Sequence, residues 1–175
     1  MTAAEGGAMN AVRMEKERSD AADVARFLEA RRQSILDDAA ARARRAHLRH
    51  YEAEGSIEKR LPALYDVLVA GVSTRDLGPI VAYCRAVAAA RFTAGFDLSE
   101  VQTAFNVLEE ATWRHALAEL PPGDAAVALG LIGTVLGAGK DALARGYVEH
   151  AARAHAPSMD LDRLVAGTDD AWLDW

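Results

Sequence analysis

The residues best suited to metal chemistry are the histidines, and their spacing argues against a metal site. They are His47, His50, His115, His150 and His155. Two metal ligands on one helix normally lie three or four positions apart, often with a carboxylate nearby. His47 and His50 have this spacing but lie among arginines, which repel a cation, whereas His150 and His155 do not share a helix face well. We therefore predict no metal site.

Nucleophile and nucleotide motifs are equally incomplete. Cys84, the single cysteine, falls on the apolar stripe of a predicted helix, which favours a small buried residue over a nucleophile. Residues 134–141 resemble a phosphate-binding loop but have Thr for its first Gly and Asp for its magnesium-binding Ser or Thr. Residues 137–142 fit a dinucleotide fingerprint, but no strand pattern surrounds them. We predict no catalytic residue, no cofactor and no enzymatic activity.

One ligand-binding alternative stays open. Phe92, Phe105, Trp113 and His115 are close enough in the sequence to line a pocket between two helices. A lone histidine in a globin-like bundle can ligate haem. The simpler interpretation is that these aromatic residues form ordinary core. The alternative function is thus a small-molecule or haem-binding helical sensor or carrier.

Composition narrows the class of protein. The 175 residues are 51% apolar with no long alternating run, which favours one helical domain. The net charge of −6 argues against nucleic-acid binding. The longest near-apolar run, 125–139, is shorter than the about 20 residues that span a bilayer, and residues 1–10 have no apolar core typical of a secretory signal. We expect a soluble, cytoplasmic protein with no nucleic-acid or membrane partner.

Apolar periodicity predicts an all-α helical bundle of about five main helices, for which globin-like packing is one arrangement. The expected helices cover residues 19–53, 57–71, 76–94, 98–120 and 124–155. Pro62 allows the second of these to begin as late as Leu61. We divide the chain into a disordered leader (1–18), a sensor-like domain (19–156) and an acidic tail (157–175).

The last predicted helix is rich in glycine, which costs about 1 kcal/mol per residue against alanine in a helix interior. Gly130, Gly133 and Gly137 lie in its first half, with Gly139 and Gly146 beyond them. Small residues at helical spacing let another helix approach closely. We expect a close helix contact here, either within the bundle or between two copies of the chain.

Residues 85–117 form the corner around which the chain is organised. Gly95 ends one helix, because glycine tolerates the left-handed conformation. Asp97 and Glu100 have the spacing of a capping box, and Phe96 and Val101 that of a hydrophobic staple. Both ends of the corner are therefore specified locally.

This corner resembles a known family. Its pattern is similar to the signature of the RsbRD-type N-terminal domain, through Arg91, Gly95, Phe96, Leu98, Val101, Leu108 and Trp113. The resemblance is clearest over residues 80–120 and extends over about 20–155. It implies an all-α, non-enzymatic input domain of stress-signalling regulators or kinases, often dimeric. We therefore expect a signalling sensor or adaptor that forms a homodimer and binds a regulator or kinase.

Several residues are candidates for partner binding. Arg42, Arg45 and Arg49 share a helix face that either docks an acidic partner or is simply solvated. The acidic tail ends in large apolar residues, and either docks in a partner groove or packs on its own bundle. The partner-binding candidates are Arg42, Arg45, Arg49, Arg91, Phe96, Trp172, Leu173 and Trp175.

Overall fold

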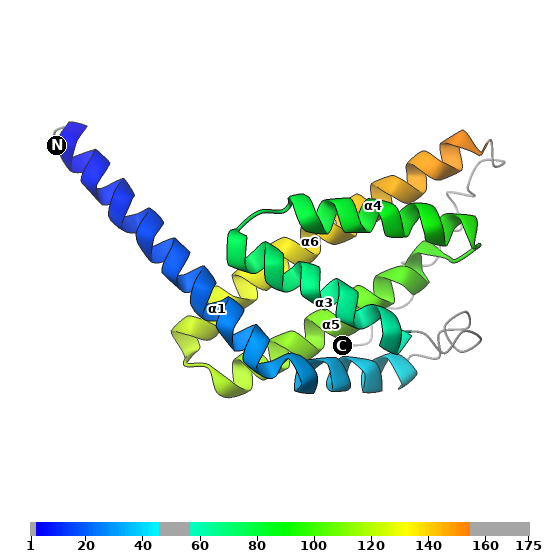
Figure 1. Cartoon of the computed structure of the whole chain (residues 1–175), viewed down its shortest axis with the longest axis horizontal. Helices are drawn as coiled ribbons and strands as arrows, with labels where there is room; N and C mark the ends of the chain where they lie inside the picture. Colours follow the sequence, from blue (N-terminus) through cyan, green and yellow to red (C-terminus); the bar gives the residue numbers. More distant parts are fainter. Residues whose placement is uncertain (1–2, 46–56, 155–175) are drawn as a thin grey trace, which may run out of the picture.

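The computed structural model describes residues 3–45 and 57–154, which form an all-α bundle (Figure 1). Within these two ranges the chain has five helices and no strand, as predicted. The helices are α1 (Ala3–Arg45), α3 (Ile57–Thr74), α4 (Gly78–Thr93), α5 (Leu98–Glu119) and α6 (Pro122–Arg153). Globin-like packing stays a prediction.

The long helix α6 packs against all four other helices, most extensively against α4 and α5. Helix α1 crosses α3 and α5, and its N-terminal part extends away from the bundle (Figure 1). Where the helices meet, the largest fully buried side chains are Tyr65, Leu28, Ile35, Leu61, Leu68, Ile80, Leu108, Ile132, Leu136 and Leu143. Burial of each such side chain contributes about 1.5–3 kcal/mol.

Tyr65 makes a buried polar link between two helices. Its hydroxyl donates a hydrogen bond of 2.8 Å from α3 to the carbonyl of Leu28 in α1. Burial raises the pKa of this phenol well above its ordinary value. The proton that the hydrogen bond requires therefore stays in place at any ordinary pH.

Helix α1 begins earlier than we predicted. It starts at Ala3, so residues 3–18, which we expected to be a disordered leader, are helical. Their composition favours a helix, and Arg13 and Glu17 form an ion pair one turn apart at 2.9 Å. Glu17 also pairs with Arg75, just after α3, at 2.8 Å. The predicted end of this helix, at residue 53, lies outside the described residues.

Pro62 lies inside its helix, whereas Pro79 lies in the first turn of its helix. Helix α3 begins at Ile57 and includes Pro62, so a start as late as Leu61 was wrong. Proline removes one backbone hydrogen bond, to the carbonyl four residues earlier, and the helix continues around it. In α4, Pro79 lies in the first turn, where its missing N–H costs no helical hydrogen bond.

The glycines of α6 fall into two groups. A Cβ on Gly146 would lie 2.6 Å from Ala88 Cβ, and one on Gly139 would lie 3.0 Å from Ile80 Cγ1. At these two glycines α6 packs closely on α4, although the predicted close contact was based on the spacing of other small residues, Gly130, Gly133 and Gly137 among them. Gly130, Gly133 and Gly137, in contrast, have no neighbouring atom within 4 Å of such a Cβ. Their side of α6 makes no close contact with the rest of the described chain.

Helix α6 also passes a simple test for a membrane span. Among the described residues it is the one helix that is long and apolar enough, with a mean hydropathy of 1.4 over its best window. The core helix of a soluble bundle passes the same test. In the fold, apolar residues of α6 such as Ile132, Leu136 and Leu143 are buried against the other helices.

We predict opposite effects for alanine at two of these glycines. Gly146→Ala should lower the free energy of unfolding by about 1–3 kcal/mol, because its Cβ overlaps Ala88. Gly137→Ala should raise it by about 0.5–1 kcal/mol, because alanine is the better helix former and meets open space. Urea unfolding of the two variants checks this. Both variants are measured at a protein concentration where the chain is monomeric, because a second copy packed on this face would reverse the effect of Gly137→Ala. A loss of stability of the monomer in Gly137→Ala would contradict the open face.

Candidate functional site

The corner between α4 and α5 is built on a left-handed glycine. Gly95 has φ +78°. Its N–H donates to the carbonyl of Phe92 at 3.1 Å, and the N–H of Phe96 donates to the carbonyl of Arg91 at 3.0 Å. These two bonds define a Schellman motif, which satisfies the last carbonyls of a helix. The Arg-Gly-Phe part of the family signature is thus the sequence of a helix end.

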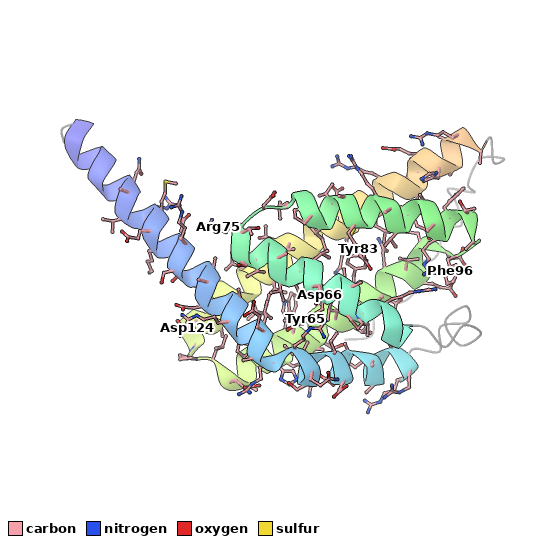
Figure 2. All side chains as sticks on the ribbon, viewed as in Figure 1. Tyr65, Asp66, Arg75, Tyr83, Phe96 and Asp124 are labelled. Atoms are coloured by element: carbon pink, nitrogen blue, oxygen red, sulfur yellow. The ribbon has the colours of Figure 1, made fainter. Side chains whose placement is uncertain are left out.

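The motif turns Phe96 into the bundle, where two arginines lie against its ring. Phe96 is only 6% exposed. The guanidinium carbon of Arg91 lies 4.6 Å from the ring centroid, and that of Arg60, from the start of α3, lies 5.8 Å away. Such cation–π contacts contribute about 0.5–1 kcal/mol each at partly exposed sites. Figure 2 shows Phe96 at the opposite end of α4 from Arg75.

Helix α5 begins where we predicted but without the predicted cap. Asp97 is the N-cap residue in an extended conformation, yet its side chain makes no capping hydrogen bond. The capping box of Asp97 and Glu100 was therefore wrong. Phe96 and Val101 are both buried, as the hydrophobic staple requires. The start of α5 rests on this apolar packing and on the Schellman turn.

The C-terminal part of α6 packs against the corner between α4 and α5. The Tyr147 hydroxyl donates to the carbonyl of Phe96 at 3.2 Å. The Phe92 ring packs edge-on against Tyr147, with centroids 5.9 Å apart, and stacks on the His150 ring at 5.8 Å. The corner thus joins four helices at one end of the bundle. Sequence reasoning missed Arg60 and Tyr147, because their contacts with Phe96 cross distant parts of the chain.

A small cavity lies beside this corner, between α3, α4 and α5. Its volume is about 90 Å³. The lining residues are Arg60, Leu61, Leu64, Tyr83, Val87, Arg91, Val101, Ala104 and Phe105. A larger groove of about 430 Å³ follows α1 and the start of α3. In that groove Arg32 pairs with Asp66 at 2.7 Å, so part of its charge is already compensated.

The aromatic pocket that we considered for haem does not form as one site. Of its four residues only Phe105 lines the cavity, while Phe92 packs on α6. Trp113 lies further along α5, and its Nε1 is buried with no hydrogen-bond partner among the described residues. The Nδ1 of His115 lies 3.1 Å from Glu119. The histidine is thus engaged by a carboxylate of its own helix.

Of the three arginines predicted to share a face of α1, Arg42 is used within the chain. Arg42 pairs with Asp38 at 3.1 Å and with Glu110 of α5, and its side chain is 17% exposed. Arg31 pairs with Glu119, also in α5. Among the predicted partner-binding arginines only Arg45 is exposed in the described part of the chain. Arg49, Trp172, Leu173 and Trp175 lie outside the described residues.

Cys84 is buried in the core, as predicted. Its side chain is fully shielded, and burial raises the pKa of its thiol to about 12. At neutral pH the thiol therefore stays protonated, and the thiolate needed for nucleophilic attack does not form. The residue acts as a small apolar side chain facing Gly139 of α6.

Comparison with known protein families supports the resemblance noted at the corner between α4 and α5. The described residues form an all-α helical bundle whose α4–α5 corner is a Schellman turn. Residues 33–158 match the family described as the RsbT co-antagonist protein rsbRD N-terminal domain. The chain belongs to this family of N-terminal domains of stress-response regulators, as its signature residues predicted. No curated protein matches the chain.

A double-mutant cycle should isolate the contact between Arg91 and Phe96. We combine Arg91→Gln with Phe96→Leu and expect a coupling of about 0.5–1 kcal/mol in the free energy of unfolding, because the ring loses its cation. Urea unfolding of the four proteins measures it. The matched control replaces Arg91→Gln with Arg85→Gln, an exposed arginine of the same helix. A coupling near zero for Arg91, or an equal one for Arg85, contradicts this contact.

The contacts of Glu119 in α5 with His115 and with Arg31 of α1 should weaken in acid. His115 and then Arg31 hold the pKa of Glu119 below its ordinary value of 4.5. A carboxyl with a lowered pKa stabilises the fold above its ordinary pKa, and this contribution is lost as the pH falls through the lowered value. The stability difference between the native chain and Glu119→Gln should therefore shrink below about pH 4.5.

Urea unfolding between pH 3 and 6 measures this difference, in the range where carboxyl groups titrate. The matched control is Glu15→Gln, at an exposed position of α1. A stabilising role for the Glu119 contacts is refuted if the stability difference for Glu119→Gln stays constant across this range. It is also refuted if that difference is no larger than the one for Glu15→Gln.

Proposed function

We propose that this chain is a cytoplasmic, non-enzymatic sensor or adaptor domain that works by binding a protein of a signalling pathway. Its membership of the rsbRD N-terminal domain family, over residues 33–158, carries this proposal. The match takes in most of the described bundle, including the corner at Gly95. A four-helix junction of this kind can pass a change at one helix end to the others, because packed helices move as rigid elements.

The engagement of the reactive side chains supports a binding role. His115 pairs with Glu119, His150 stacks on Phe92, and Cys84 lies protonated in the core. Among residues 3–45 and 57–154, no cluster of three His, Cys, Asp or Glu side chains is arranged to hold a metal. His115, His150 and Cys84 thus have structural surroundings of their own, while His47, His50 and His155 lie outside the described residues.

We further propose that the domain is a homodimer that binds an acidic surface of a regulator or kinase. The open side of α6 around Gly130, Gly133 and Gly137 leaves room for the close approach of a second helix. Arg45 is exposed near the C-terminal end of α1 and is basic, which suits an acidic partner. The proposal includes no nucleic-acid or membrane partner.

Charge reversal on α1 tests the partner surface. Native mass spectrometry of the purified chain should show a dimer, and affinity capture from the native cells should retrieve a regulator or kinase. Arg45→Glu should weaken binding of that purified protein by roughly tenfold, about 1.4 kcal/mol. The control is Arg26→Glu, which makes the same charge change at an exposed position of the same helix.

Two results would overturn the proposal. One is a monomeric chain that retrieves no signalling protein. The other is equal binding of the retrieved protein by the native chain and Arg45→Glu, which would remove the arginine face of α1 from the interface. Near-ultraviolet circular dichroism of each variant shows whether the bundle is intact.

A further inference from the structure

The buried stripe of helix α1 continues past the point where the bundle ends. Leu28, Ala21 and Met14 lie seven residues apart, so they share one face of the helix. Leu28 and Ala21 are at most 1% exposed, whereas Met14 is 56% exposed. Every side chain from residue 10 to residue 16 is exposed as well. The N-terminal arm of α1, which we define as residues 3–18, thus carries the stripe of a packed helix into solvent.

Helix α6 has an exposed face with the same periodicity. Val127, Gly130, Thr134 and Gly137 recur at intervals of three and four residues, and at least part of each is open to solvent. The Thr134 hydroxyl donates to the carbonyl of Gly130 at 2.8 Å, so it needs no partner from outside the helix. Residues 125–139 contain no charged side chain. This face is therefore narrow, uncharged and suited to another helix with the same spacing.

The arm cannot cover this face in its own chain. Helix α1 is continuous from Ala3 to Arg45, and Figure 1 shows its N-terminal part running in a different direction from α6. A continuous helix cannot fold back without a break in its backbone hydrogen bonds. The two surfaces nevertheless match in length, because the arm spans about 24 Å and α6 between residues 124 and 137 spans about 20 Å. A second copy of the chain supplies the missing partner for both.

Opposite charges lie at one end of each surface. Arg18, at the base of the arm, is exposed and lines a groove of about 320 Å³ between α1 and the end of α3. Asp124 is exposed in the first turn of α6. Neither residue forms an ion pair within the described part of the chain. If Arg18 of one copy meets Asp124 of the other, the arm runs antiparallel to α6, and Met14 comes to the level of Val127 and Gly130.

We propose that two copies of the chain exchange their α1 arms, so that each arm lies antiparallel on the exposed face of the other copy's α6. Met14 packs where Gly130 has no side chain, and Arg18 pairs with Asp124 across the interface. Two-fold symmetry makes the same contact twice. The inference rests on the homodimer proposed above and names the surfaces that form it.

Two charge reversals test the exchange. Arg18→Asp brings two carboxylates together in both contacts, and Asp124→Arg brings two cations together, so each variant should dimerise at least tenfold more weakly than the native chain. An equal mixture of the two variants restores opposite charges in both contacts. We therefore expect a mixed dimer of near-native affinity. Native mass spectrometry over a concentration series resolves it, because the two variants differ in mass.

A third variant tests the apolar part of the contact. Gly130→Leu fills the exposed face of α6, although no atom of its own chain lies within 4 Å of the added Cβ. It should keep the near-ultraviolet circular dichroism of the native chain and dimerise at least tenfold more weakly. The matched control is Lys16→Asp, which makes the same change in net charge at an exposed position on the side of α1 away from Met14. It should leave dimerisation unchanged.

The arm exchange is overturned, while the homodimer stands, if a native dimer is unaffected by Arg18→Asp or if the mixture of reversed variants gives no mixed dimer. A dimer weakened only by Gly130→Leu, or equally by Lys16→Asp, has the same meaning. A native chain that stays monomeric overturns the homodimer and the exchange together. If either reversal disturbs the circular dichroism spectrum, Arg18→Glu and Asp124→Lys provide a second pair with the same expected outcomes.

Discussion

The left-handed conformation of Gly95 is the constraint on which this bundle end depends. It reverses the chain after α4 and turns Phe96 inward, so that the side chain is buried while its carbonyl accepts the Tyr147 hydroxyl. Arg91 then lies against the ring at the position where a Schellman motif usually has an apolar contact. The cavity and the contacts with α6 form around this turn.

Charge has a different role on the other side of the bundle. Helix α1 carries arginines along much of its length, and three of them pair with α3 or α5: Arg31, Arg32 and Arg42. Exposed ion pairs contribute at most about 1 kcal/mol each. They nevertheless fix the orientation of a helix whose buried face consists largely of alanine and a few larger apolar residues. A basic face in a sequence is thus equally typical of docking within a chain and between chains.

Helix α6 combines two kinds of glycine in one segment. Gly139 and Gly146 are required by steric contact, because α4 approaches too closely for a side chain. Gly130, Gly133 and Gly137 have no such reason within the described chain and lower the helix propensity of α6. Glycine residues in α6 therefore reflect intramolecular packing at one end of the helix and an open face at the other.

The sequence by itself determined the helices, their apolar stripes and the glycine at the corner, because these depend on side chains within a turn or two of each other. It also placed the burial of Cys84 correctly. It was wrong about residues 3–18, which form a helix with an ion pair one turn apart, and about the cap at Asp97, whose side chain makes no capping hydrogen bond. Only the tertiary structure decided that Arg60 and Tyr147 meet Phe96, that Arg42 is paired with Glu110, and that a cavity lies beneath two arginines. The reason is physical: these contacts join residues far apart in the chain, and they exist only once the helices have packed.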